Sequence, residues 1–174
     1  PKDNILGSPE IDTKKGFGGV MQTFDNTRPI VAAMALGVAR ASLEVTETFL
    51  KEAGVDTRMR GSRWTQHAAT AELHRMKAEL EAARLLTLKA AWMADNGIPN
   101  SVEASMAKAK AGRTANEVTL RCVELCGATG YGETELLEKW ARDSKILDIF
   151  EGTQQIQNLI IARRVLNKSS AELK

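Results

Sequence analysis

Apolar residues recur along most of the chain at the spacing of a helix rather than of a strand. The first such stretch has apolar or small residues three or four positions apart, at Ile30, Met34, Gly37, Ala41, Val45 and Phe49. This spacing predicts one face of a long helix. Residues 25–29 supply its expected start, with Asn26 or Thr27 as the cap and Pro29 in the first turn, and we expect it to end near Ala53.

Further helical patterns follow, separated by short polar or glycine-containing stretches. They predict helices at about 64–95, 102–125, 135–148 and 153–166. The polar residues 54–63 read as a loop, and the glycines within residues 126–132 are expected to break the third helix. No segment alternates apolar and polar residues over the length of a strand. The sequence therefore predicts an all-α fold, an antiparallel helical bundle.

The two ends of the chain differ in composition from the periodic part. Residues 1–20 contain two prolines and the glycine-rich run 16–19 (GFGG), which are typical of a connector. We expect the compact domain to span residues 21–168 and residues 169–174 to fray. Because the sequence starts with Pro1 rather than Met, we expect the chain to be the C-terminal part of a longer protein.

Composition indicates a globular domain and argues against several functional classes. Hydrophobic residues make up 43% of the chain and charged residues 26%, so the sequence is too apolar for a disordered segment. A net charge of +2 without a dense Lys/Arg run argues against nucleic-acid binding. No apolar stretch is expected to span a membrane, which needs about 18 residues, and no signal peptide is visible.

The two cysteines are interpreted as reduced core residues of a cytosolic protein. Cys122 and Cys126 lie four positions apart, on one face of a predicted helix, where a disulfide is geometrically poor. Two thiols without histidine partners do not make a zinc site, and no metal site is expected.

A single carboxylate stands out near the C-terminus. Glu151 follows the apolar pair Ile149-Phe150 and directly precedes a predicted helix start. One interpretation is a carboxylate stabilised by the dipole at a helix N-terminus. The other is a general base held against an apolar wall that raises its basicity. The pattern alone leaves both interpretations open.

Three motifs resemble those of the acyl-CoA dehydrogenase family, in its C-terminal helical domain. Residues 149–157 (IFEGTQQIQ) resemble the family signature Ile-Tyr-Glu-Gly-Thr-x-Gln-Ile-Gln around the catalytic glutamate. Residues 24–33 (FDNTRPIVAA) resemble the segment that opens its substrate-binding helix, and residues 139–146 (KWARDSKI) resemble its Arg-Asp-x-Lys-Ile run. The motifs occur in the family's order and the likeness covers nearly the whole chain. It implies that residues 1–20 link to a preceding β-domain.

The resemblance implies α,β-dehydrogenation of an acyl-CoA thioester. Glu151 would take the α-proton, and a hydride from the β-carbon would pass to FAD. Arg28 and Gly152 would lie in the acyl-CoA site, with Asp25 and Thr27 toward the CoA chain. The alternative for Arg28 is a surface arginine beside a proline. Some relatives carry the base at the position that corresponds to Thr27, which cannot serve as a base.

The cofactor positions match the family only in part. Thr153 and Gln155 resemble residues that contact the flavin of their own subunit; the alternative for Thr153 is an ordinary helix cap. A neighbouring subunit commonly adds an Arg-x-(Thr/Ala)-Phe-Gly loop and a Gln-x-x-Gly-Gly run. Here the corresponding stretches read GVDTRMRGSR (54–63) and ELCGA (124–128). The candidates within them for a pyrophosphate contact are Arg58, Arg60, Arg63, Glu124 and Gly127, although Glu124 adds like charge and Ala128 replaces a glycine.

The altered cofactor loops bear on the expected partners. A homo-oligomer, dimer or tetramer, is expected, and a heteromer with a second acyl-CoA dehydrogenase-like subunit is the alternative. By resemblance the electron acceptor is an electron-transferring flavoprotein. A non-catalytic subunit and an acyl-CoA oxidase remain alternative functions. The location is expected to be cytoplasmic, in a bacterial cytosol or a mitochondrial matrix, and we expect this chain by itself to bind flavin poorly and not to turn over.

Overall fold

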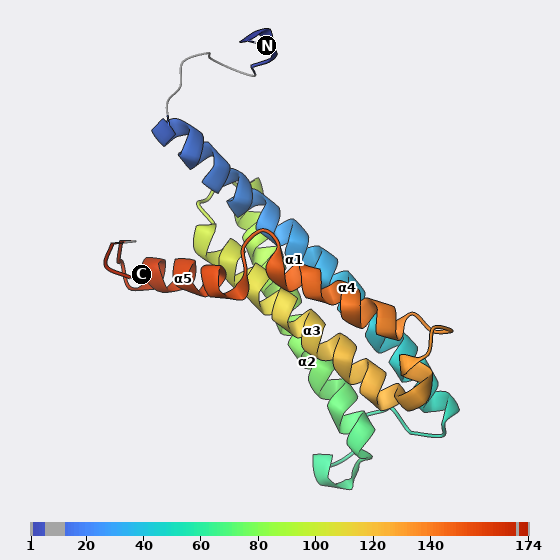
Figure 1. Cartoon of the computed structure of the whole chain (residues 1–174). Coiled ribbons are helices and arrows are strands. Elements are labelled where there is room, and N and C mark those ends of the chain that lie inside the picture. The colour runs from blue at the N-terminus through green and yellow to red at the C-terminus, as the bar shows by residue number, and fades with distance from the viewer. Residues whose placement is uncertain (1, 6–12, 170, 174) are drawn as a thin grey trace.

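The computed structural model describes residues 2–5, 13–169 and 171–173, and all the regular structure in these ranges is helical (Figure 1). The elements are the 3₁₀ turns η1 (Lys2–Asn4) and η2 (Arg63–Thr65) and the helices α1 (Thr13–Glu52), α2 (Ala68–Asp95), α3 (Ser101–Tyr131), α4 (Leu137–Ile149) and α5 (Gln154–Val165). The predicted all-α fold class is confirmed.

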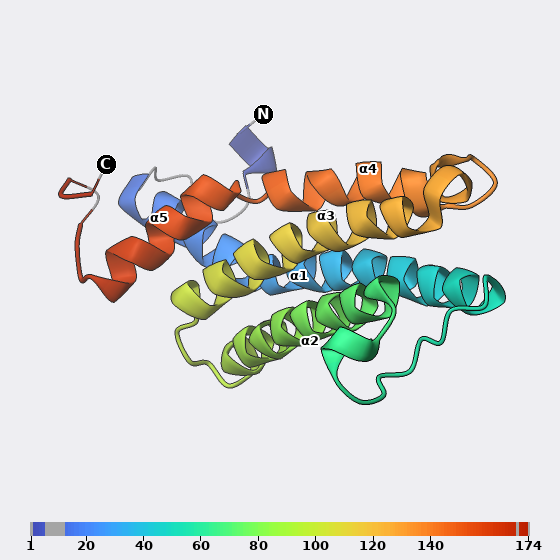
Figure 2. The same ribbon diagram turned by 90° about the horizontal axis from the view of Figure 1, so that it is seen from below.

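The helices α1 to α4 run alongside one another in alternating directions, and α5 crosses one end of this bundle (Figures 1 and 2). The helix α3 contacts all four others, whereas α5 packs chiefly on α3. The short connections that follow α2 and α3 favour this antiparallel arrangement. The turn between α4 and α5 is thereby held against the first half of α3 and beside α1.

Small side chains dominate the core where the long helices meet. The fully buried alanines include Ala39, Ala83, Ala107 and Ala115, and side chains of this size let helix backbones approach closely. Larger apolar residues, such as Leu73, fill the space between them.

Both cysteines are buried and free, as predicted. Burial raises the pKa of the Cys122 thiol to about 12, and it also raises the pKa of Cys126. A thiolate is the reactive form of cysteine, so both residues act as inert core groups.

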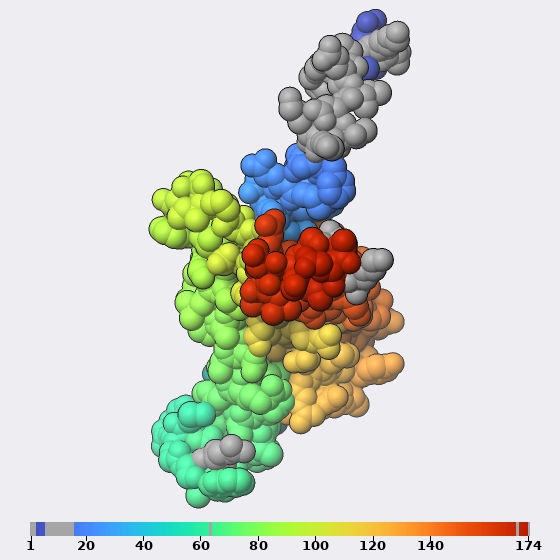
Figure 3. All heavy atoms as spheres, turned by 90° about the vertical axis from the view of Figure 1, so that its left-hand side faces the viewer, coloured from blue at the N-terminus to red at the C-terminus, as the bar shows by residue number. Residues whose placement is uncertain are grey.

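The predicted start of the first helix is wrong, because α1 begins at Thr13 and contains Pro29 in its interior. Residues 13–20 are therefore helical rather than part of a connector; residues 6–12 lie outside the described residues. In Figure 3 the first turns of α1 project beyond the rest of the bundle. Glycine and proline weaken a helix locally, but a helix that is fixed further along by packing propagates cooperatively through such residues.

The predicted apolar face of the first helix is also wrong in its first half. Ile30 and Met34 are 61% and 53% exposed, and the buried face instead carries Val31, Ala35 and Ala39. One long stretch of α1 has the length and apolar composition of a membrane span, contrary to the sequence-based expectation. It does not indicate such a span, because α1 packs against α2, α3 and α4 as a central helix of the bundle.

The other helix ends agree with the predicted ones within a few residues, with one exception. The third helix continues to Tyr131, past its predicted end near Leu125, across a kink at Gly127. There the backbone takes φ 57° and ψ −136°, which glycine adopts without a steric penalty. At the C-terminus, Arg163 donates two hydrogen bonds to the carbonyl oxygen of Leu173, at 3.1 and 2.7 Å.

Candidate active site at the α4–α5 junction

Two consecutive residues with positive φ make the turn between α4 and α5. Glu151 has φ 56° and Gly152 has φ 103°, and Thr153 then occupies the N-cap of α5. Positive φ is uncommon for a residue with a side chain and marks a locally strained position. At Gly152 a side chain is disfavoured, because of the positive φ and because a Cβ would lie 2.5 Å from Nε2 of Gln157, which would have to shift.

Buried polar side chains bind the carbonyl groups of this turn. The amide of Gln157 donates to the carbonyl oxygens of Glu151 and Gly152, both at 3.1 Å. The ammonium of Lys108, on α3, donates to the Gly152 oxygen at 2.6 Å. Next to them, Gln154 donates to the backbone oxygen of Ala109 and to the carboxylate of Asp148, which ties α5 to α3 and α4.

The carboxylate of Glu151 points back to α1. The hydroxyl of Thr27 donates to Oε2 of Glu151 at 2.5 Å, so the fold joins two residues that are 124 positions apart. No hydrogen bond to the other carboxylate oxygen occurs among the described residues. One oxygen is thus oriented by the protein and the other remains available to accept a proton.

Arg28, one residue further along α1, is 4% exposed, so its interpretation as a surface arginine is wrong. It pairs with Asp25 at 2.6 Å, lies 3.5 Å from the hydroxyl of Ser105 and stands 5.9 Å from the ring centroid of Phe24. Burial lowers the pKa of Arg28, and the charges of Asp25 and Glu151 oppose that shift. Its Nε is buried without a hydrogen-bond partner among the described residues.

A groove with a volume of about 680 Å³ opens beside Arg28 and Asp25. Its other lining residues come from α1, α3, α5 and the C-terminal segment: Phe17, Met21, Ser101, Ile160, Arg163, Arg164, Asn167, Lys168, Ser169 and Glu172. Cations outnumber carboxylates in this lining, which suits an elongated anionic ligand.

The two predicted flavin contacts on the same chain lie at the start of α5. Thr153 is the N-cap by position, but its side chain makes no capping hydrogen bond, and Gln155 is exposed. Both side chains therefore offer polar groups outside the bundle, next to a helix N-terminus that attracts negative charge.

The other predicted cofactor residues lie at the opposite end of the bundle. Arg58 and Arg60 belong to the α1–α2 loop, 25 or more residues beyond the site of Thr27 along α1, or roughly 40 Å along a helix. Both guanidinium groups pair with Asp56, at 2.8 and 3.8 Å. The side-chain hydrogen bond from Arg58 lowers the pKa of Asp56 to about 2. The side chain of Arg63 is not among those described.

Glu124 and Gly127 lie near the C-terminal end of α3. Glu124 is exposed and pairs with Arg121, which also pairs with Glu72. This pairing offsets the negative charge that distinguishes the segment from the family motif. Gly127 is exposed and forms the kink of α3.

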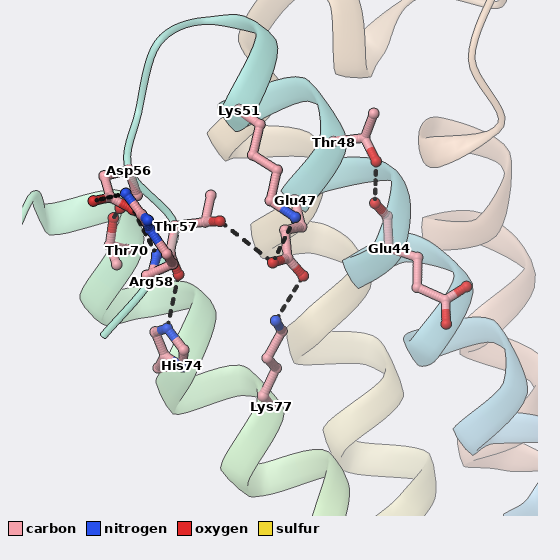
Figure 4. A network of polar contacts seen from close by, with 10 residues as sticks. All are labelled: Glu44, Glu47, Thr48, Lys51, Asp56, Thr57, Arg58, Thr70, His74 and Lys77. Atoms are coloured by element: carbon pink, nitrogen blue, oxygen red, sulfur yellow. Dashed lines mark hydrogen bonds and ion pairs between the residues drawn. The ribbon is translucent and has the colours of Figure 1, made fainter. Parts of the chain in front are cut away.

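A network around Glu47 fixes the base of the α1–α2 loop (Figure 4). Glu47 accepts bonds from Lys77 of α2 at 2.6 Å and from Thr57 of the loop at 3.3 Å, and it pairs with Lys51 at 3.1 Å. His74 of α2 bonds the backbone oxygen of Thr57 at 2.9 Å. The hydrogen bond from Lys77 is the main cause that lowers the pKa of Glu47 to about 2.

Sequence reasoning missed Lys108, Gln154 and Gln157, which are buried at the site. Lys108 had a detectable signal, since it interrupts the apolar helical face formed by Ala104, Ala111 and Ala115. The glutamines carried a weaker signal, because the pattern after Glu151 does not tell which side of α5 is buried.

Comparisons with known proteins agree with this fold. Residues 14–166 match the family model of the acyl-CoA dehydrogenase C-terminal domain. Over 167 residues the chain is 37% identical to the mitochondrial short-chain specific acyl-CoA dehydrogenase of Bos taurus, a match that covers 95% of this chain and 39% of that protein.

Two solved structures are similar in fold and in sequence. Butyryl-CoA dehydrogenase from Megasphaera elsdenii has a TM-score of 0.81 and 35% identity, over 95% of this chain and 42% of that one. A chain in a structure that concerns the electron transferring flavoprotein of Acidaminococcus fermentans and flavin-based electron bifurcation has a TM-score of 0.82 and 35% identity, over 97% and 42%.

The chain belongs to the acyl-CoA dehydrogenase family and corresponds to its C-terminal domain. It spans about two fifths of the length of the curated relatives that it matches.

Proposed function

We propose that the protein containing this chain removes one α- and one β-hydrogen from an acyl-CoA thioester, with Glu151 as the base for the α-proton. The observation that carries the proposal is the geometry of Glu151. Its carboxylate projects from a strained turn. One carboxylate oxygen accepts a hydrogen bond from the hydroxyl of Thr27 at 2.5 Å, and the other has no hydrogen bond among the described residues. A base must have such an accessible, oriented oxygen.

The neighbours of Glu151 have distinct roles in this proposal. Thr27 orients the carboxylate, and the unbonded oxygen takes the proton from the α-carbon. Arg28 places a buried positive charge near Glu151, and the charge of Glu151 in turn raises the pKa of Arg28. The groove beside Arg28 and Asp25, rich in cations, would receive the phosphorylated part of the CoA chain. Gly152, next to the base in the same turn, would lie at the acyl end of the site.

The residues at the start of α5 fit the flavin that the family uses. Thr153 lacks a capping hydrogen bond and Gln155 is exposed, so both can bind a polar ring edge. FAD, when bound, supplies the acceptor for the β-hydride. In an oligomer, Arg58, Arg60, Glu124 and Gly127 would face the flavin of a neighbouring subunit, because they lie in the α1–α2 loop and near the C-terminal end of α3, far from Glu151 on their own chain.

The relatives narrow the substrate and partner that we propose. One is short-chain specific and another acts on butyryl-CoA by its name, so a short acyl chain is the first candidate. The likeness to a chain from work on an electron transferring flavoprotein favours such a flavoprotein as the electron acceptor. The bovine relative is mitochondrial, so a mitochondrial matrix stands beside a bacterial cytosol as the proposed location.

A non-catalytic subunit of a heteromer is the second candidate, and one observation favours it. The guanidinium groups of Arg58 and Arg60 are already engaged by Asp56 within the loop, which leaves them less available to a diphosphate. This candidate predicts a full-length protein that binds acyl-CoA but copurifies with little flavin.

The visible spectrum of the purified full-length protein separates these functions. We expect a flavin band that an anaerobic panel of acyl-CoAs of increasing chain length bleaches selectively. Release of hydrogen peroxide on admission of oxygen would instead indicate an acyl-CoA oxidase. A colourless protein that still binds acyl-CoA would contradict the dehydrogenase and support the non-catalytic subunit.

A further inference from the structure

Lys108 is the largest fully buried side chain among the described residues. Burying an ammonium group is costly unless it is paired or hydrogen-bonded. Its one hydrogen bond goes to the backbone oxygen of Gly152 at 2.6 Å, and it has no ion-pair partner among the described residues. Because the buried ammonium of Lys108 binds only this carbonyl oxygen among the described residues, we infer that its role is to fix the position of the Gly152 carbonyl group.

Charged groups from three directions surround the ammonium of Lys108. Burial lowers its pKa, and Arg28 from α1 acts in the same direction. Asp148 from α4 and Glu151 from the turn raise its pKa. Lys108 thus senses the charges of both the candidate base and the buried carboxylate of α4, and among the described residues it forms an ion pair with neither.

The carbonyl group that Lys108 binds belongs to the strained part of the turn. Glu151 and Gly152 both have positive φ, and their carbonyl oxygens turn inward toward the bundle. The amide of Gln157 also binds both oxygens, but it comes from α5, directly after the turn. Lys108 comes from α3, so its bond joins the turn itself to the bundle, beside the bonds that Gln154 makes to α3 and α4.

We propose that Lys108 is a positioning residue for the α-proton base: its hydrogen bond to Gly152 fixes the turn that presents the Glu151 carboxylate. This inference rests on the role of Glu151 proposed above. Without the ammonium, the Gly152 oxygen keeps its bond from Gln157, so the fold survives while the carboxylate loses its fixed place beside Thr27.

The test measures proton abstraction separately from flavin reduction. The full-length protein is incubated in heavy water with 3,3-dimethylbutyryl-CoA, which has α-hydrogens but no β-hydrogens, and deuterium uptake at the α-carbon is followed by mass spectrometry. We expect Lys108→Met to slow this exchange about tenfold or more, because small displacements of a catalytic group cost that much. Flavin content should not change, and the dissociation constant for the acyl-CoA should change by less than about twofold.

Matched variants keep the outcome specific. Lys110→Met removes a lysine of the same helix that pairs with Glu79 outside the site, and it should leave the exchange rate unchanged. Should Lys108→Met fail to fold, Lys108→Leu, which also removes the N–H donor and the charge, carries the test with the same expected slowing.

Three results would overturn the inference. Exchange at the wild-type rate in Lys108→Met would show that the hydrogen bond does not position the base. Parallel loss of flavin, acyl-CoA binding and exchange would show that Lys108 only supports the fold. Exchange that is absent from the wild type or survives in Glu151→Gln would remove Glu151 as the base, and the inference would fall together with the proposed function.

Discussion

The two ends of the bundle position their candidate functional side chains by different means. At the α4–α5 junction the supporting groups are buried: Lys108 and Gln157 are fully buried, and Asp148 is 5% exposed. At the α1–α2 loop the ion pairs are largely in solvent, since the side chains of Asp56 and Arg58 are 49% and 66% exposed. The loop is anchored below them by the half-buried network around Glu47.

This difference indicates that the α4–α5 junction is held more rigidly than the α1–α2 loop. A buried polar group that loses its partner costs its full desolvation penalty, whereas a solvent-exposed ion pair contributes little. The junction therefore has one arrangement, as the proposed role of Glu151 as a base would require. The loop can change its sequence without loss of the fold, which agrees with its departure from the family motif.

The largest expected effect on stability is at Gly152. We expect Gly152→Ala to lower the free energy of unfolding of the full-length protein in urea by about 3 kcal/mol, because it combines a disfavoured φ with a clash against Gln157. The control Gly54→Ala also has positive φ but open space around its Cβ, and should cost about 1 kcal/mol. An equal loss of unfolding free energy in Gly152→Ala and Gly54→Ala would contradict the proposed difference in packing between the two ends of the bundle.

The next prediction compares the loss of stability on replacing a buried carboxylate, Asp148, and an exposed one, Asp56. Burial raises the pKa of Asp148, but hydrogen bonds from Gln154 and Lys145 lower it overall. Asp148→Asn replaces one accepting oxygen with a donor, and should cost about 2 kcal/mol in the same urea experiment. Asp56→Asn should leave the unfolding midpoint unchanged. A loss at Asp56 as large as that at Asp148 would contradict the account.

A smaller effect concerns acid stability at the loop. The folded pKa of Glu47 is about 2, below its ordinary value of 4.5. Its contribution to stability, about 1 kcal/mol, is thus fully present above pH 4.5 and is lost as the pH falls toward 2. Unfolding curves of wild type and Glu47→Gln should differ at pH 6 and converge near pH 2. A stability difference between wild type and Glu47→Gln that grows as the pH falls would contradict this prediction.

The sequence predicted the helices better than it predicted which of their faces is buried. Helical spacing and the family motifs placed α2, α4 and α5 within a few residues of their observed ends. The buried face predicted for the first half of α1 was wrong, because the spacing of apolar residues does not tell which of them pack in the core of this chain. Ile30 and Met34 are exposed, whereas Val31 and Ala35 are in the core. Pro29 also did not mark the start of α1 as predicted, because the helix, fixed by packing further along, continues through it.

At the site, the sequence motifs pointed to Glu151, Thr27 and Arg28, and the structure brings these residues together. The supporting groups were not found, since their contacts join α3 and α5 across more than 40 positions of sequence. A lysine within an alanine-rich helical face was the one visible sign of them.

The most direct test of the central claim is the rate of flavin bleaching in anaerobic stopped-flow mixing of the full-length protein with its preferred acyl-CoA. Glu151→Gln keeps the shape of the side chain and removes the base, and Glu133→Gln changes an exposed glutamate as the control. We predict that Glu151→Gln slows bleaching about a thousandfold while acyl-CoA still binds, and that Glu133→Gln matches the wild type. Bleaching of Glu151→Gln at the wild-type rate would contradict the account.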